Sequence, residues 1–328
     1  METFRRRLLA AGAAALLVPG AALAQLPGAP AAAPREKGPR VFLDYDQAEL
    51  DAAYDQSVWA PNQQQVTGRY ATNSDLTRAR LGAPRRVAYG PTEIEKLDIY
   101  SPKRGNAPVM VFIHGGAWRG GRSKDYAFLA ENFVRAGAHF VVVDFAWAQD
   151  VGGSLFAMAD QVRRAVAWCH RNAASFGGDT NRLYVSGHSS GGHLAGVVAV
   201  TDWQRDFGLP PDAVKGTVCV SGIYDLQPVR LSSRSGYVKF TDDMVQALST
   251  MRYIERIRAP MVVAYGKLES PEFQRQNREF AEALQAAGRP VLLVVGEGYN
   301  HFELIETLAS PYGLVGRPAL ELMRVQPS

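Results

Sequence analysis

Short apolar runs recur along the chain between residues 109 and 296. They are rich in β-branched and aromatic residues and lack the alternation of apolar and polar positions of a half-exposed strand, so they predict strands buried on both faces. The runs are Val109–His114, Phe140–Phe145, Leu183–Gly187, Thr217–Gly222, Met261–Gly266 and Val291–Gly296. Before them, Arg86–Gly90 and Lys96–Tyr100 alternate, which predicts an antiparallel pair at the edge of a sheet.

Stretches with helical periodicity separate these runs. Apolar positions from Leu155 to Cys169 recur at helical spacing, with arginines off that face. A second helix is predicted with Ser270 as its N-cap, Pro271 as its first residue and Gly288 as its stop. The alternation of strands and helices predicts a doubly wound, mostly parallel α/β sheet flanked by helices, in a single domain over residues 41–328.

The region before the strand pattern is mixed in character. Residues 25–40 are rich in Ala and Pro and predict a flexible linker. Within residues 41–84, Glu49–Asp55 predicts a short helix, Pro61 interrupts it, and no strand run is visible. We therefore expect residues 41–84 to wrap the domain or to lie over its active-site face, where they could form a lid.

The first 24 residues have the features of an export signal. Arg5-Arg6-Arg7 precede an apolar run from Leu8 to Val18, and Ala22-Leu23-Ala24 form a small-residue cleavage site. The run is too short to cross a membrane. A cleaved signal peptide and a periplasmic or secreted protein without a stable membrane anchor are therefore predicted. The start of this segment also resembles a twin-arginine signal, which leaves the export route open.

Composition changes this picture little. The 328 residues are 47% hydrophobic and 21% charged, which is typical of a chain with a large core. Without residues 1–24 the chain carries 33 Lys and Arg against 31 Asp and Glu, so charge gives no reason to expect a nucleic acid partner. Cys169 and Cys219 lie in apolar stretches and are predicted as buried thiols, with a disulfide as the alternative in an oxidising compartment.

The run at Leu183–Gly187 leads into Gly187-His188-Ser189-Ser190-Gly191, a match to the G-x-S-x-G pattern of a nucleophile elbow. In such a motif a strained turn between a strand and a helix raises the serine hydroxyl above the end of the sheet. The two glycines let the chain pass through this turn. The N-terminus of the following helix favours developing negative charge. Ser189 is therefore the predicted nucleophile.

A base and an acid are expected later in the chain, in the order Ser, acid, His. Among the six histidines, only His193 and His301 follow Ser189. His193 lies one helical turn beyond the nucleophile, where we expect a packing or hydrogen-bonding role, whereas His301 follows the last apolar run and is the predicted base. The predicted acid is Glu269, three residues beyond the penultimate strand, with Glu272 and Asp225 as alternatives.

An oxyanion hole requires backbone N–H groups aimed at the developing negative charge. The amide of Ser190 is one predicted donor, and the pair Gly115-Gly116, directly after a buried strand, supplies the other. His114 is predicted to be structural. Four aromatic residues near strand ends predict a pocket for an acyl or aryl group: Trp118, Trp147, Tyr224 and Tyr237.

Together these residues resemble the α/β-hydrolase superfamily, and within it the kynurenine formamidase (arylformamidase) and carboxylesterase group. The shared segments extend over most of residues 41–310. They are Ala53-Tyr54-Asp55, Tyr89-Gly90, Glu95–Tyr100, His114–Trp118, Ser123–Phe128, the elbow, Glu269–Phe273 with Arg275-Gln276, and His301-Phe302. The resemblance implies the α/β-hydrolase fold and places the acid at Glu269, where the family usually has Asp. Ala117 replaces an aromatic residue often found after the two glycines, which implies a more open pocket.

The hypothesis from the sequence is an exported serine hydrolase that cleaves a small carboxylic ester through Ser189, His301 and Glu269, with an acyl-enzyme and no cofactor or metal. One alternative is an arylformamidase acting on N-formylkynurenine or another aryl-formamide. Another is a non-catalytic α/β-hydrolase-like binding protein, against which the intact serine, histidine and acid argue. The export signal favours the ester, because formylkynurenine breakdown is a cytoplasmic step.

Overall fold

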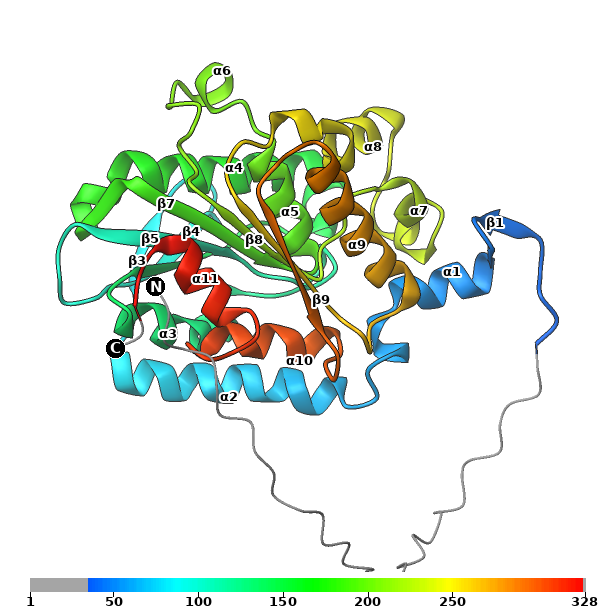
Figure 1. The fold of residues 1–328 in the computed structure, drawn as a ribbon, viewed down its shortest axis with the longest axis horizontal. Helices are drawn as coiled ribbons and strands as arrows, with labels where there is room; N and C mark the ends of the chain where they lie inside the picture. Colours follow the sequence, from blue (N-terminus) through cyan, green and yellow to red (C-terminus); the bar gives the residue numbers. More distant parts are fainter. Residues whose placement is uncertain (1–34, 327–328) are drawn as a thin grey trace, which may run out of the picture. The chain divides into compact units, whose positions relative to one another are not determined.

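The computed structural model describes residues 35–326, so the predicted signal peptide and most of the predicted linker lie outside the described residues. Within these residues, eight strands form one sheet in which the two at one edge, β3 and β4, are antiparallel and the others are parallel (Figure 1). Both features agree with the predictions. In spatial order the strands are β10 (Val291–Gly296), β9 (Met261–Gly266), β8 (Thr217–Val220), β7 (Gly178–His188), β5 (Ala107–Ile113), β6 (His139–Val143), β4 (Lys96–Tyr100) and β3 (Arg85–Ala88).

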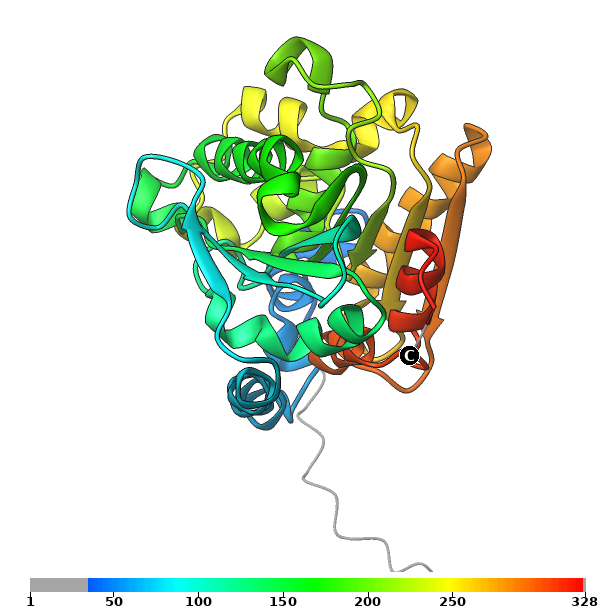
Figure 2. The same ribbon diagram turned by 90° about the vertical axis from the view of Figure 1, so that its left-hand side faces the viewer.

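The register of the parallel strands brings their carboxyl ends to one edge of the sheet. Ile113 at the end of β5 pairs with Gly187 in β7, and His188 in turn pairs with Val220 in β8. Gly266 and Gly296 end β9 and β10 opposite one another. Residues that follow these strands therefore meet in space although they are far apart in sequence. Figure 2 shows β3 and β4, in cyan, towards one edge of this sheet and β9 and β10, in orange, towards the other.

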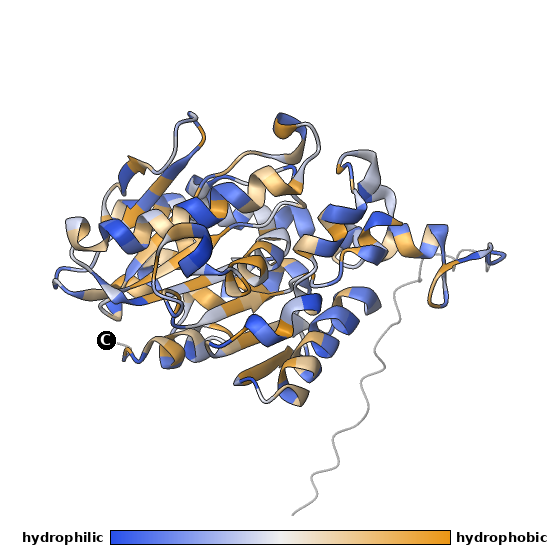
Figure 3. Cartoon of the chain, turned by 90° about the horizontal axis from the view of Figure 1, so that it is seen from above, coloured by the Kyte–Doolittle hydropathy of each residue, from blue (hydrophilic) through white to orange (hydrophobic). Residues whose placement is uncertain are grey.

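Helices cover both faces of the sheet, because successive strand residues point to opposite sides and each face is apolar. In β5, Val111 belongs to one hydrophobic cluster while Met110 and Phe112 belong to the other. Figure 3 shows the strands mainly in hydrophobic colours between helices of mixed hydropathy. The first cluster includes residues of α1 (Gln47–Tyr54), α4 (Leu155–Asn172), α5 (Ser190–Ala199), α6 (Trp203–Phe207), α7 (Gln227–Arg230), α8 (Asp242–Leu248) and α9 (Pro271–Ala286). The second includes residues of α2 (Gln63–Leu81), α3 (Ala130–Arg135), α10 (His301–Glu306) and α11 (Gly316–Met323).

The segment before the sheet differs most from the sequence prediction. A short hairpin of β1 (Arg40–Phe42) and β2 (Tyr45–Asp46) stands where no strand was expected, and β1 begins inside the predicted linker. α2, a helix of 19 residues, was also not predicted. Its buried side chains recur every three to four residues, but two of the four are Ser74 and Thr77, so the hydrophobic pattern is faint.

Two further expectations concern the cysteines and the membrane. Cys169 and Cys219 are both buried free thiols, as predicted. No helix within residues 35–326 has the length and apolar character needed to cross a membrane.

Candidate active site

Ser189 occupies a strained turn between β7 and α5. Its backbone has φ 58° and ψ −123°, a conformation that residues other than glycine rarely adopt. Ser189 is also the N-cap of α5. The flanking positions have room only for glycine. A Cβ on Gly187 would overlap the carbonyl of Gly191, and a Cβ on Gly191 would overlap the carbonyl of Ile113. The turn thus has the geometry of a nucleophile elbow, in which the surrounding structure holds an unfavourable backbone conformation.

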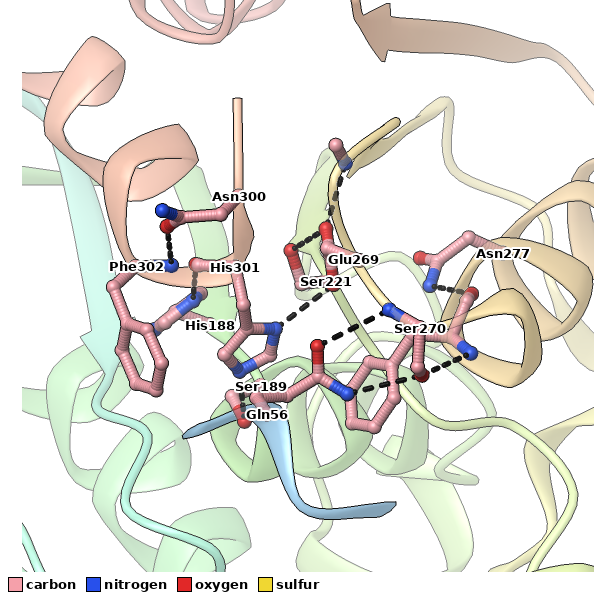
Figure 4. Close-up of polar contacts among 12 residues, drawn as sticks. Gln56, His188, Ser189, Ser221, Glu269, Ser270, Asn277, Asn300, His301 and Phe302 are labelled. Carbon is pink, nitrogen blue, oxygen red and sulfur yellow. Dashed lines mark hydrogen bonds and ion pairs between the residues drawn. The ribbon is translucent and has the colours of Figure 1, made fainter. Parts of the chain in front are cut away.

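A chain of hydrogen bonds connects Ser189 to a buried carboxylate (Figure 4). His301 Nε2 lies 2.9 Å from Ser189 Oγ, and His301 Nδ1 lies 2.8 Å from Glu269 Oε2. All three side chains are buried, with at most 5% of each residue exposed. The structure therefore brings together the predicted nucleophile, base and acid.

Hydrogen bonds position the backbone around His301 as well as its ring. It is the first residue of α10, and the side chain of Asn300 caps that helix by accepting hydrogen bonds from the amides of Phe302 and Glu303. The Nε2–H of His188 donates to the carbonyl of His301 at 2.9 Å, and the two rings lie 4.8 Å apart. Burial, together with the neighbouring His301, holds the pKa of His188 well below its usual value, so His188 is neutral.

The carboxylate of Glu269 is oriented by two further donors. Its Oε1 accepts from the Ser221 hydroxyl at 2.7 Å and from the Gly266 amide at 2.6 Å, which leaves Oε2 for His301. Ser221 itself has φ 52°, so a second strained residue stands beside the first. The sequence reasoning missed Ser221 and Asn300. The Asn-x-x-Glu spacing of a capping box was a readable signal for Asn300, whereas Ser221 was visible only as a polar residue at a strand end.

The two alternative acids do not contact His301. Asp225 caps a turn by accepting from the Gln227 amide. Glu272 forms a two-point ion pair with Arg275 and accepts from the hydroxyl of Tyr54. Each carboxylate therefore has another structural role.

The predicted oxyanion donors lie next to Ser189. Ser190 is the first residue of α5, so its amide is one of the free N–H groups of that helix. A Cβ on Gly115 would lie 3.1 Å from the Ser189 Cβ, which places this backbone directly beside the nucleophile. Gly116 has φ +123°, a conformation open only to glycine, and it lines the same cavity as Ser189. The backbone at the predicted oxyanion positions therefore lies beside Ser189.

Two other histidines take structural positions. His114 is buried, stacks on Phe145 with ring centroids 4.4 Å apart, and its Nδ1 lies 2.8 Å from the Gly115 carbonyl oxygen. His193 accepts a hydrogen bond from Trp118 Nε1 and donates one from Nε2 to the Leu248 carbonyl. His193 therefore links the loop after β5 to α5, below the nucleophile.

Ser189 and His301 open into a cavity of about 450 Å³. One wall comes from the carboxyl ends of the strands, with Gly116, Ala117, His188 and Ser189. The other wall, here named the cover, consists of residues 54–70 and 233–237. Part of the segment expected over the active-site face therefore lies there.

Among the four predicted pocket aromatics, Tyr237 lines this cavity and the other three do not. Trp118 and Tyr224 are fully buried, and Tyr224 stacks on Phe280 with centroids 3.8 Å apart. Trp147 lies outside the cavity, with its Nε1 bonded to the Gly121 carbonyl. The prediction for these three is corrected. Trp118 and Tyr224 pack into the core, as large side chains next to strand ends often do, whereas the half-buried ring of Trp147 packs against the Arg122 guanidinium.

The cover is tied to the C-terminal part of the chain. Asn62 donates to Glu303 at 2.7 Å and accepts from Asn300 at 2.8 Å. The Tyr70 hydroxyl bonds the Phe302 carbonyl, and Arg69 forms a two-point ion pair with Glu306. These contacts hold the cover against α10, the helix that begins with His301.

Arrangements of this kind perform acyl transfer. In such a site His301 would remove the Ser189 proton as the hydroxyl attacks a carbonyl, and Glu269 would fix the tautomer and stabilise the imidazolium. Backbone amides beside Ser189 would then stabilise the tetrahedral oxyanion. No group of His, Cys, Asp and Glu side chains within residues 35–326 is arranged to hold a metal ion.

Comparisons with known proteins find similarity along most of the chain. A sequence model of the BD-FAE family matches residues 97–284. The chain is 31% identical over 291 residues to kynurenine formamidase of Danio rerio, covering 84% of this chain and 96% of that protein. It is 29% identical over 256 residues to esterase LipC of Mycobacterium tuberculosis, covering 70% of this chain and 62% of that protein.

A solved structure shares the fold. A thioesterase candidate from Silicibacter sp. TM1040 superimposes with a TM-score of 0.70 at 24% identity, covering 80% of this chain and 96% of that one. At this identity the similarity concerns the arrangement of the strands and helices, and it supports the α/β-hydrolase fold that the sequence predicts.

Proposed function

Because this chain belongs to the BD-FAE family of α/β-hydrolases, we propose that it is an exported serine hydrolase that cleaves a small carboxylic ester. The chain is a hydrolase that acts on ester or formamide bonds, the activity for which its relatives are named. The observation that carries the finer proposal is the hydrogen-bond chain from Ser189 through His301 to Glu269.

The proposed reaction has two halves. Ser189 attacks the ester carbonyl while His301 takes its proton, and the leaving alcohol receives that proton as the acyl-enzyme forms. Water then attacks the acyl-enzyme with His301 again as the base. The Ser190 amide and an amide of Gly115 or Gly116 stabilise both tetrahedral intermediates, and no cofactor takes part.

A second candidate is an arylformamidase that acts on N-formylkynurenine or another aryl-formamide. The 31% identity to kynurenine formamidase over 96% of that protein favours it. The same serine, histidine and acid serve both reactions, since the scissile group in each case is a carbonyl attacked by a nucleophile.

A direct comparison of substrates distinguishes the two. We expect kcat/KM for the aryl ester 4-acetoxybenzoate to exceed that for N-formylkynurenine, measured side by side. Both substrates carry a carboxylate, so the comparison concerns the bond that is cleaved. A preference for the formamide of a hundredfold, about 2.7 kcal/mol at the transition state, would replace the esterase proposal with the arylformamidase.

Labelling tests whether the serine is a nucleophile at all. An organophosphonate should modify the protein at one residue, and peptide mass spectrometry should locate it at Ser189. The Ser189→Ala variant is the control and should not be labelled. Unlabelled wild-type protein with no hydrolysis of either substrate would instead support a non-catalytic binding protein.

The export proposal rests on the sequence of residues 1–24. Expression of the full chain with its signal should release a protein whose N-terminus is Gln25, as read by intact mass. An uncleaved chain that stays in the cytoplasm would contradict it.

A further inference from the structure

One buried cation in the cavity has no carboxylate partner. Arg234 lines the cavity that contains Ser189, and only 6% of it is exposed. Its Nη2 donates to the Tyr54 carbonyl at 2.9 Å, while its Nη1 is buried without a hydrogen-bond partner among the described residues. No ion pair within residues 35–326 joins Arg234 to an Asp or a Glu. The guanidinium stays charged at any physiological pH, so a full positive charge stands here unpaired.

A second, half-buried arginine shows how a cation is usually compensated in a protein interior. Arg275 bonds Glu272 through two nitrogens, at 2.8 and 2.6 Å, and it also bonds Glu279. Burial of a cation is costly unless an anion and hydrogen bonds compensate it. Among the described residues, carboxylates thus bond Arg275, whereas none bonds Arg234.

Aromatic rings hold the Arg234 side chain in place. Its Cζ lies 5.2 Å from the centroid of Trp118, 5.6 Å from that of Tyr54 and 6.0 Å from that of Phe273. Cation–π contacts of this kind offset part of the desolvation cost. They act on the face of the guanidinium and do not use its N–H groups, so Nη1 keeps its capacity to donate.

The other charged residues that line the cavity also leave it with an excess of positive charge. A second arginine, Arg119, lines the cavity with its guanidinium 4.6 Å from the Tyr237 ring centroid. Asp55 is the one carboxylate among the residues that line the cavity, and it is engaged by the amide and hydroxyl of Ser57. Two cations therefore face one anion, which already has local donors.

We propose that Arg234 is the specificity-determining residue of the pocket and binds a free carboxylate on the substrate, away from the bond that Ser189 cleaves. The preferred substrate is thus an ester or aryl-formamide that carries an acidic group. A carboxylate matches the planar fork of a guanidinium and would supply the missing acceptor, with Arg119 drawing the anion toward the cavity. This inference rests on the proposed function, because it concerns the same cavity and the same reaction.

The test uses pairs of esters that differ in charge at similar size. The pairs are 4-acetoxybenzoate with 4-acetoxybenzamide, and the monophenyl ester of adipic acid with phenyl hexanoate. We expect wild-type kcat/KM to favour the acid by at least tenfold in one of the two pairs. In Arg234→Met the acid should lose at least tenfold, while its neutral partner changes by less than threefold.

Two controls separate binding from a structural role. Arg230→Met removes a cation of the same segment that pairs with exposed Asp242, and it should leave the preference unchanged. The melting temperature of Arg234→Met should not fall far, since an uncompensated charge is removed, whereas Arg275→Met should lower it by leaving Glu272 unpaired. Equal losses on both members of a pair, with a lower melting temperature, would show that Arg234 only braces the aromatic rings.

The wild-type result alone can overturn the inference. If the enzyme cleaves the neutral esters through Ser189 and shows no preference for an acid in either pair, the carboxylate site is wrong and the proposed function stands. If no ester or formamide is cleaved and Ser189 is not labelled, the proposed function falls and this inference falls with it.

Discussion

The two walls of the cavity around Ser189 are built in different ways. Residues of the wall of strand ends are positioned by backbone hydrogen bonds between paired strands in the core. These strands are β5, β7, β8, β9 and β10. The cover is placed by side-chain hydrogen bonds and by packing of α1 and α2. We therefore expect the strand ends to determine the reaction and the cover to determine which substrate reaches them.

The largest effect is expected at the strand ends. Ser189→Ala should lower kcat by roughly 10⁵- to 10⁶-fold on every substrate, because the triad acts as a unit. Ser186→Ala is the matched control, since this hydroxyl lies in β7, the strand that leads to Ser189, is buried and has no hydrogen-bond partner among the described residues. Its activity should stay within threefold of wild type. Substantial hydrolysis by Ser189→Ala would assign the nucleophile elsewhere.

Substitution of the acid, Glu269, should lower kcat by a somewhat smaller factor than Ser189→Ala. In Glu269→Gln the side chain can no longer fix the tautomer of His301, and a loss in kcat of about 10³- to 10⁴-fold is expected. Glu269→Asp keeps the charge but shortens the reach, so it should fall between this variant and wild type. Ser221→Ala removes one of the two donors to Oε1 and should cost less than either. Steady-state kinetics on phenyl acetate rank the four proteins, and a wild-type rate in Glu269→Gln would contradict the role of this acid.

A pH experiment probes how firmly the loop after β5 is held to α5. Burial lowers the pKa of His193 from 6.5 to about 4. The unfolded chain therefore binds this proton more readily than the folded chain, and the free energy of unfolding should decrease as pH falls from 6.5 towards 4. The contribution of His193 is on the order of 3 kcal/mol when the pH has fallen below both values.

The matched variant isolates this contribution. Urea unfolding of wild type and His193→Gln between pH 7.5 and 4.5 should give a shallower decline for the variant. Parallel declines would show that His193 does not titrate with unfolding.

The smallest effect is expected at the cover. Tyr237→Ala removes a half-buried ring that lines the cavity and supports Arg119. Since it touches none of the three hydrogen-bonded side chains, kcat should stay within threefold while KM rises by less than tenfold. The KM change should differ between substrates of different shape. A fall in kcat equal to that of Glu269→Gln would abolish the distinction between the two walls.

The difference between the wall of strand ends and the cover also explains which site residues could be predicted from the sequence. Strands buried on both faces leave uninterrupted apolar runs, and the elbow, the histidine and the acid each follow such a run at a short distance. Ser189, Glu269 and His301 could therefore be proposed together. The sequence also led us to expect residues 41–84 over the active-site face, but it did not reveal how the cover is built. The helix α2 buries Ser74 and Thr77 as well as Val66 and Tyr70, so its apolar pattern is faint. The contacts that hold the cover to α10 join residues more than 200 positions apart.

The sequence was least informative about which single aromatic residues line the cavity. Trp118, Trp147 and Tyr224 share with Tyr237 a place near strand ends, but their environments depend on tertiary packing that no local pattern records. Arg234 was not proposed from the sequence for the same reason. A lone arginine in a polar stretch reads as a surface residue, and only the fold shows that it is buried without a carboxylate.

The contacts between the cover and α10 also set when the enzyme can become active. Asn62 bonds Asn300 and Glu303, so the ribosome must have passed residue 303 before this wall of the cavity can close. The nucleophile at residue 189 is synthesised more than a hundred residues before its base. A partly made or truncated chain would thus carry the serine without a working site. Hydrolysis should appear only after α10 has been synthesised and has met the cover.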